Sequence, residues 1–170
     1  VIVEPVQGEA GVIVPPDGYL RGLRSLCDAH GALLILDEVQ TAFGRTGRWF
    51  GCEHEGVVPD VLATAKSLGG GMATLAATIS RGEVYRRAYG NPHDCLIQTT
   101  TFGGRTSACA AGIAALETLL DDRLAERAEH LGRVLAERLK AVQARHPDWI
   151  TEVRGRGLMI GIELHPELVE

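Results

Sequence analysis

Short apolar segments that alternate with a helical pattern constrain the fold of this chain more than any other feature. Residues 32–36 (ALLIL) form a continuous apolar run, as expected of a strand buried on both faces. Residues 1–3, 61–64 and 73–80 are further strand candidates, and residues 20–27 place leucines at helical spacing. This alternation predicts an α/β fold with a mainly parallel sheet covered by helices.

The pattern changes in the last third of the chain. From residue 106 it is helical for about forty residues, with an expected break near Asp121 and Asp122, and four leucines recur on one face of the second half, at Leu124, Leu131, Leu135 and Leu139. We expect this face to pack in the core rather than to bind a partner. Residues 149–153 and 158–164 predict a strand pair.

This change predicts two parts. Residues 1–120 are expected to belong to a larger domain, and residues 121–170 to form a connecting helix and the start of a smaller α+β domain. The chain opens on an apolar strand without an initiator methionine and stops after another strand, so we expect a fragment of a longer protein.

The net charge of −5, the pI of about 5.7 and the lack of a basic run argue against a nucleic-acid or membrane-surface partner. The four cysteines, Cys27, Cys52, Cys95 and Cys109, match no zinc spacing, and the Cys52–His54 pair is too small for a metal site. We expect reduced thiols in a cytoplasmic protein and no metal.

Two charged residues, Asp37 and Lys66, follow predicted buried strands, at the sheet edge where ligands bind in open α/β folds. The chain has two lysines against fifteen arginines, and one of the two stands between an apolar strand and three glycines. Lysine, unlike arginine, can lose its proton when desolvated and then attack a carbonyl to form a Schiff base. Asp37 is suited to keep a heterocyclic nitrogen protonated. Taken singly, a solvent-reaching lysine and a loop-capping aspartate remain the alternatives.

The surrounding motifs resemble the class III aminotransferases. They are LDEVQT at residues 36–41, GRTG at 44–47, AKSLGGG at 65–71, EPVQGE at 4–9 and TFGG at 101–104. In that family the aspartate and the lysine lie about thirty positions apart, and here the interval is 29. The resemblance implies a fold-type I, aspartate aminotransferase-like transferase that uses pyridoxal 5′-phosphate, and it runs through essentially the whole chain.

The resemblance also implies roles for single residues. Lys66 matches the Schiff-base lysine and Asp37 the partner of the pyridine nitrogen. Val39 matches the residue that packs on the ring, and Gln40 the residue that bonds the ring hydroxyl. The remaining matches are Thr101 with the threonine that reaches the cofactor phosphate of the neighbouring subunit, Glu9 with a substrate-gating glutamate, and Glu4 with a supporting residue near the ring.

The implied reaction is transamination from an amine or ω-amino acid to a 2-oxo acid such as 2-oxoglutarate, in a homodimer whose active site lies at the subunit interface. The stretch TTTF at residues 99–102 and CEHE at 52–55 look most like the putrescine branch, with the ornithine and acetylornithine enzymes close behind. Arg105 and Thr106 stand where relatives commonly have Asn-Pro, and residues 72–76 lack the family's Pro and Gly, so the substrate is left open.

Other functions compete with this hypothesis. An aminomutase of the glutamate-1-semialdehyde type would use the same lysine and aspartate. Gly155, Gly157 and Gly161 resemble a nucleotide-binding fingerprint, but their spacing is wrong and no helix follows. A non-catalytic fragment or interaction protein is the remaining alternative.

Overall fold

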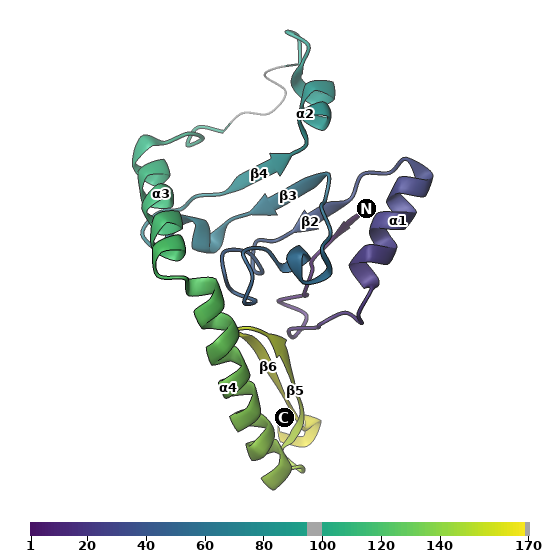
Figure 1. Cartoon of the computed structure of the whole chain (residues 1–170), viewed down its shortest axis with the longest axis vertical. Helices are drawn as coiled ribbons and strands as arrows, with labels where there is room; N and C mark the ends of the chain where they lie inside the picture. The colour runs from purple at the N-terminus through teal and green to yellow at the C-terminus, as the bar shows by residue number, and fades with distance from the viewer. Residues whose placement is uncertain (95–99, 169–170) are drawn as a thin grey trace.

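The computed structural model describes residues 1–94 and 100–168, so Cys95 and Thr99 lie outside the described residues. Its larger part is a four-stranded sheet in the order β1-β2-β3-β4 (Figure 1). The strands are β1 (Ile2–Val3), β2 (Ile35–Asp37), β3 (Val61–Thr64) and β4 (Ala77–Ser80). The first three run parallel and β4 pairs antiparallel with β3, which confirms the predicted α/β class with a mainly parallel sheet.

The described residues form four α-helices: α1 (Tyr19–His30), α2 (Gly82–Tyr89), α3 (Thr106–Asp121) and α4 (Leu124–Arg145). Figure 1 shows α1 beside the β1–β2 side of the sheet and α3 at the opposite side. The helix α1 ends at Gly31, whose φ of 62° is the left-handed conformation expected of a terminating glycine. The helix α2 was not predicted from the sequence, and it buries none of its residues.

The strand β2 begins at Ile35, three residues later than predicted. The cause is Asp60, because its carboxylate accepts a hydrogen bond from the Leu34 N–H at 2.8 Å. The Leu34 carbonyl accepts from the N–H groups of both Asp60, at 2.9 Å, and Val61, at 3.2 Å, so the pairing with β3 is irregular at Leu34. Leu34 and Leu36 are fully buried but Leu33 is 45% exposed, so the run alternates and is not buried on both faces.

The core of this part gathers buried residues from α1, the sheet and the short 3₁₀ helix η1 (Gly51–Glu55). Its members are Leu20, Cys27, Leu34, Leu36, Cys52, Val57 and Leu62. Burial of this apolar surface is the main force that fixes α1 and η1 on the sheet. The sheet edge at the carboxyl ends of β2 and β3 is thereby held on a rigid base.

The last third of the chain forms a separate layer in which α4 packs on a hairpin of β5 (Ile150–Arg156) and β6 (Met159–Leu164) (Figure 1). The strands pair antiparallel, so the glycines at 155, 157 and 161 belong to a hairpin and not to a nucleotide loop. The helix break predicted near Asp121 lies between α3 and α4. The division into domains at this break stays a prediction.

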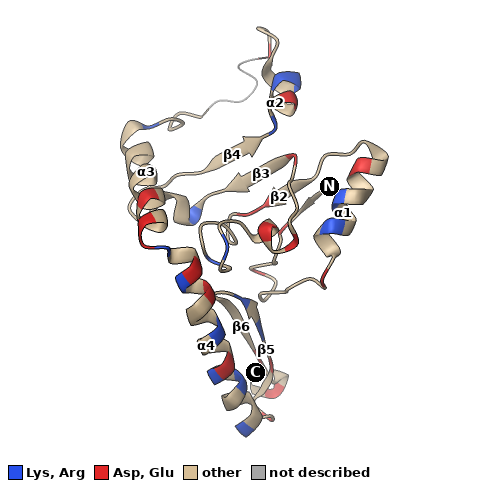
Figure 2. Cartoon of the chain, viewed as in Figure 1, with Lys and Arg blue, Asp and Glu red and all other residues tan. Residues whose placement is uncertain are grey.

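The prediction that α4 packs through its leucine face holds only in part, because Leu124 and Leu139 are half-buried but the two leucines between them are exposed. Leu131 and Leu135 are 40% and 42% exposed, whereas the buried residues of α4 are small: Ala125, Ala128 and Gly132. The reason is a close backbone approach, since a Cβ at Gly132 would lie 2.1 Å from the Gly157 carbonyl oxygen. Figure 2 shows charged residues of both signs along α4, whereas β3 and β4 contain none.

Candidate active site

The ends of β2 and β3 bring the two predicted catalytic residues to one edge of the sheet. Asp37 is the last residue of β2, and its register partner on the parallel strand β3 is Ala63. Lys66 lies three residues after Ala63 and begins the short 3₁₀ helix η2 (Lys66–Gly69). Both residues therefore lie at the carboxyl edge, where ligands bind in sheets of this kind.

The backbone of Lys66 is strained. Its φ of 46° is in the left-handed region, which a residue with a β-carbon rarely adopts. Such a conformation costs on the order of 1–3 kcal/mol and is found mainly at functional sites. Lys66 is exposed, although Thr64, two residues before it, is buried.

A cavity of about 340 Å³ lies beside Lys66. Its walls come from η2, from the loops after β1 and β2, and from the hairpin. They comprise Val12, Val39, Gln40, Arg45, Lys66, Ser67, Leu158, Met159 and Ile160. The volume falls within the usual range for small-molecule sites, roughly 300–1,000 Å³. Lys66, Val39 and Gln40, three of the residues singled out from the sequence, thus share one cavity.

Asp37 is not among the described residues that line this cavity. The Oδ1 atom of Asp37 accepts a 3.0 Å hydrogen bond from the N–H of Val39, and Asp37 is half-buried. Asp37 therefore supports the loop that lines the cavity. Its contact with a ring nitrogen stays a prediction.

Gln40 connects the cavity to the residues predicted at the start of the chain. Its Nε2 donates a 2.8 Å hydrogen bond to Glu9 Oε1. Glu4 Oε2 accepts a 2.9 Å hydrogen bond from the N–H of Gly8, so Glu4 fixes the turn that carries Glu9. Gly8 itself packs on the Gln40 amide, and a Cβ there would lie 2.4 Å from Gln40 Oε1. Glu4, Glu9 and Gln40 thus form one connected group.

Thr101 lies apart from this group. It is exposed, in a turn that precedes α3, and it is not among the described residues that line the Lys66 cavity. Its predicted role, a contact with the cofactor of a neighbouring subunit, stays a prediction.

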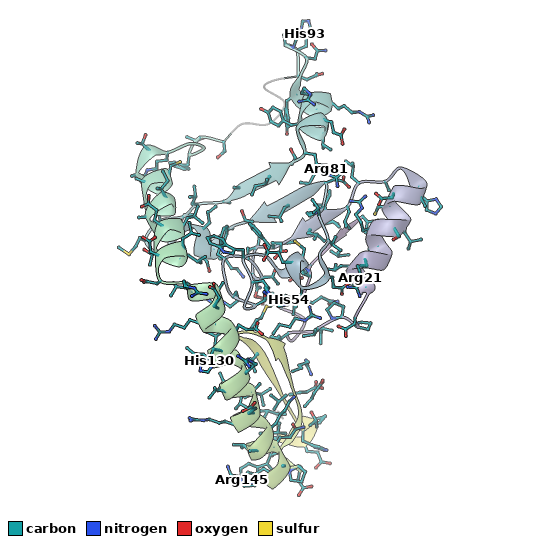
Figure 3. All side chains as sticks on the ribbon, viewed as in Figure 1. Arg21, His54, Arg81, His93, His130 and Arg145 are labelled. Atoms are coloured by element: carbon teal, nitrogen blue, oxygen red, sulfur yellow. The ribbon has the colours of Figure 1, made fainter. Side chains whose placement is uncertain are left out.

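The Cys52–His54 pair is occupied with structural contacts. Burial, the charge of Glu38 and a hydrogen bond to that carboxylate raise the pKa of the Cys52 thiol to about 12. His54 Nε2 lies 3.0 Å from the Thr46 carbonyl oxygen, and its pKa is lowered by burial and by the nearby charge of Arg156. Figure 3 shows His54 where the sheet part approaches the upper end of α4. Among residues 1–94 and 100–168, no three His, Cys, Asp or Glu side chains are placed to hold a metal ion.

Glu38 supports the site from outside the cavity, and the sequence reasoning missed it. It is fully buried directly beside Asp37, and its carboxylate accepts three hydrogen bonds. A second charge next to Asp37, immediately after a buried apolar run, was the available signal.

The chain has the fold of the fold-type I pyridoxal-phosphate transferases, and it belongs to the class III aminotransferases, since the family described as Aminotransferase class-III matches residues 1–170. This match confirms the family expected from the motifs, and enzymes of the family depend on pyridoxal 5′-phosphate, the cofactor that the motifs imply.

Three solved structures illustrate the similarity. The ornithine aminotransferase from Toxoplasma gondii is 40% identical with a TM-score of 0.91, and the match covers 98% of this chain and 38% of that one. The acetylornithine aminotransferase from Elizabethkingia anophelis is 40% identical with a TM-score of 0.89, covering 96% and 39%. An (S)-enantioselective ω-transaminase from Thermomicrobium roseum is 39% identical with a TM-score of 0.91, covering 97% and 36%. The present chain therefore spans well under half the length of these enzymes.

Proposed function

We propose that the complete protein transfers an amino group from an amine or ω-amino acid, of the diamine, ornithine or acetylornithine type, to a 2-oxo acid such as 2-oxoglutarate. One observation carries this proposal: the strained Lys66 stands at the carboxyl edge of the sheet and lines a cavity with Val39 and Gln40. Family membership supports the class of reaction. The similarity to ornithine and acetylornithine enzymes supports the class of donor.

The residues present fit pyridoxal phosphate. The cavity is large enough for a small aromatic cofactor, and its lining offers an amine, an apolar side chain and an amide at Lys66, Val39 and Gln40. When bound, the cofactor supplies an aldehyde for covalent attachment and a protonated ring that withdraws electrons. Lys66 would hold the aldehyde, Val39 would pack on the ring and Gln40 would bond the ring hydroxyl.

The remaining roles follow the same assignment. Lys66 Nζ takes a proton from the amine-bearing carbon of the substrate and later returns one, acting first as a general base and then as a general acid. Asp37 keeps the ring nitrogen protonated, and Glu4 supports the turn beside it. Glu9 gates the substrate side of the cavity, through its bond to Gln40.

We also propose that the enzyme is a cytoplasmic homodimer in which Thr101 serves the neighbouring subunit's cofactor. The described cysteines Cys27, Cys52 and Cys109 are free thiols, which supports a reducing compartment. None of the described helices is long and apolar enough to cross a membrane.

Borohydride reduction of the purified, full-length protein tests the proposal. The expected result is a visible absorption band that reduction abolishes, with the cofactor then fixed on the peptide that contains Lys66. Lys140→Arg is the matched control, because Lys140 is the only other lysine of this chain and lies on α4, and it should keep the adduct. A colourless protein, or an adduct that persists in Lys66→Ala, would refute the assignment. A screen of amine donors, read by bleaching of the band, then identifies the substrate.

A further inference from the structure

A buried carboxylate, Glu38, ties together the two chain segments beneath the candidate active site. Its Oε2 accepts hydrogen bonds from the Thr41 hydroxyl and, at 2.7 Å, from the N–H of Gly51. Its Oε1 accepts from the N–H of Cys52 at 2.8 Å. All three donors are buried with it, so the cost of placing a carboxylate in the core is offset by direct hydrogen bonds.

The backbone of Glu38 is anchored as well. Its N–H donates to the Ala63 carbonyl of β3 at 2.9 Å, and its carbonyl accepts from the N–H of Ala42 at 3.0 Å. The backbone of Glu38 is therefore held by β3, and its carboxylate is held by the first turn of η1. Val39 and Gln40 are the two residues enclosed by the contact between Glu38 and Thr41.

The packing around this anchor leaves little room for adjustment. A Cβ placed on Gly51 would lie 3.0 Å from both the Pro5 and Thr41 Cβ atoms and 3.1 Å from Glu38 Oε2. No side chain would fit at Gly51, so the start of η1 packs closely on Thr41 and Glu38.

We propose that Glu38 is a positioning residue: it holds the turn of Val39 and Gln40 in the place from which both line the Lys66 cavity. This inference rests on the proposed function and extends it to a residue outside the cavity. Glutamine cannot replace the carboxylate, since both oxygens accept from N–H groups and an amide nitrogen would face one of those donors.

Glu55 supplies a matched control. It is also a buried glutamate, 8% exposed, and it anchors the other end of η1 by accepting a 3.2 Å hydrogen bond from the N–H of Arg21 on α1. Loss of this bond should weaken the fold at η1 without reaching the turn of Val39 and Gln40. Figure 3 shows Arg21 on α1, to the side of the sheet.

The experiment compares Glu38→Gln, Thr41→Val, Thr41→Ser and Glu55→Ala in the full-length protein. Two quantities are measured beside the melting temperature: the dissociation constant of pyridoxal phosphate from the apoprotein, and amide hydrogen exchange of residues 39–42 in the apoprotein. Glu38→Gln should weaken cofactor binding about tenfold or more and speed exchange in this turn, because a buried charged acceptor is lost. Thr41→Val should weaken cofactor binding and speed exchange to a smaller extent. Thr41→Ser keeps the hydroxyl and should give the wild-type values.

Glu55→Ala removes the acceptor for the Arg21 N–H, so it should lower the melting temperature while it leaves cofactor affinity and exchange at the turn near wild type. The inference is overturned if Glu38→Gln and Glu55→Ala reduce cofactor affinity equally at equal loss of melting temperature. If Glu38→Gln does not fold, Thr41→Val against Thr41→Ser decides the question. A wild-type protein that binds no pyridoxal phosphate would instead defeat the proposed function, so the two failures are distinguishable.

Discussion

The Gln40 amide is held between Glu9 and Gly8, so the cavity beside Lys66 and the turn near the start of the chain form one unit. Gln40 Nε2 donates to Glu9 Oε1 at 2.8 Å, and the amide packs so closely on Gly8 that a Cβ there would lie 2.4 Å from Gln40 Oε1. Gly8 is not among the residues with a positive φ, so glycine is required by space and not by backbone conformation.

Gly8→Ala should therefore displace the Gln40 amide and weaken binding of pyridoxal phosphate by about tenfold, as coupled neighbours commonly do. The same change in a Gln40→Ala background should have little further effect, because the clashing amide is gone. A double-mutant cycle on the cofactor dissociation constant measures this coupling. Equal losses in both backgrounds would show that Gly8 acts independently of Gln40.

The sequence was sufficient for the elements whose signal is local. The apolar run before Asp37 and the strand before Lys66 predicted the sheet edge that carries the candidate site, since parallel strands end at a common edge. The motifs around these two residues predicted the family that the whole-chain match confirms.

Features that depend on tertiary approach were not predicted. The late start of β2 follows from Asp60, 26 positions away from Leu34 in the sequence. The burial of small residues on α4 instead of its leucines follows from the backbone of Gly157, which no helical periodicity reports. Glu38 was passed over because a carboxylate is expected at the surface unless its donors are known, and two of these lie 13 and 14 positions away.

Replacement of Lys66 by glycine and by alanine separates its chemical role from its backbone strain. Both variants should lose turnover, since neither has an amine. Lys66→Gly should nevertheless have a free energy of unfolding about 1 kcal/mol higher than that of Lys66→Ala, as measured by urea unfolding. The reason is that glycine adopts a φ of 46° without strain and alanine does not. Alanine as the more stable of the two would mean that the left-handed conformation is not kept.

Asp37→Asn tests the proposed charge at the ring nitrogen with little change of shape. The Asn oxygen can still accept the hydrogen bond from Val39, which in the wild type spans 3.0 Å, so the melting temperature should change little. The proton transfer step should slow by orders of magnitude, because a neutral amide does not keep the ring nitrogen protonated. Single-turnover kinetics with a saturating donor measures this step, and an unchanged rate would mean that the anion is not needed.

The buried carboxylate of Asp60 should make the stability of the fold depend on pH. It accepts from the Leu34 N–H at 2.8 Å, pairs with Arg24 at 2.8 Å and lies 3.3 Å from Arg81 Nε; Figure 3 shows Arg81 just beyond β4. Burial alone would raise the pKa of Asp60, but the Leu34 hydrogen bond and the two arginines outweigh it and hold the pKa below its usual 3.8.

A depressed pKa in the folded state contributes stability that is fully present above the unfolded value and is lost as the pH falls through the folded value. Asp60→Asn should thus destabilise the protein by about 2–3 kcal/mol at pH 7, since Arg24 loses a buried partner. The difference from wild type should shrink below about pH 4 and vanish once Asp60 itself is protonated. Urea unfolding at pH 7, 5, 4 and 3 measures this difference in the free energy of unfolding.

Asp28→Asn is the control, because Asp28 also pairs with Arg24 but its side chain is 64% exposed. Loss of the Asp28 charge should therefore cost far less stability. A difference between wild type and Asp60→Asn that stays constant down to pH 3 would show that the charge of Asp60 does not stabilise the fold.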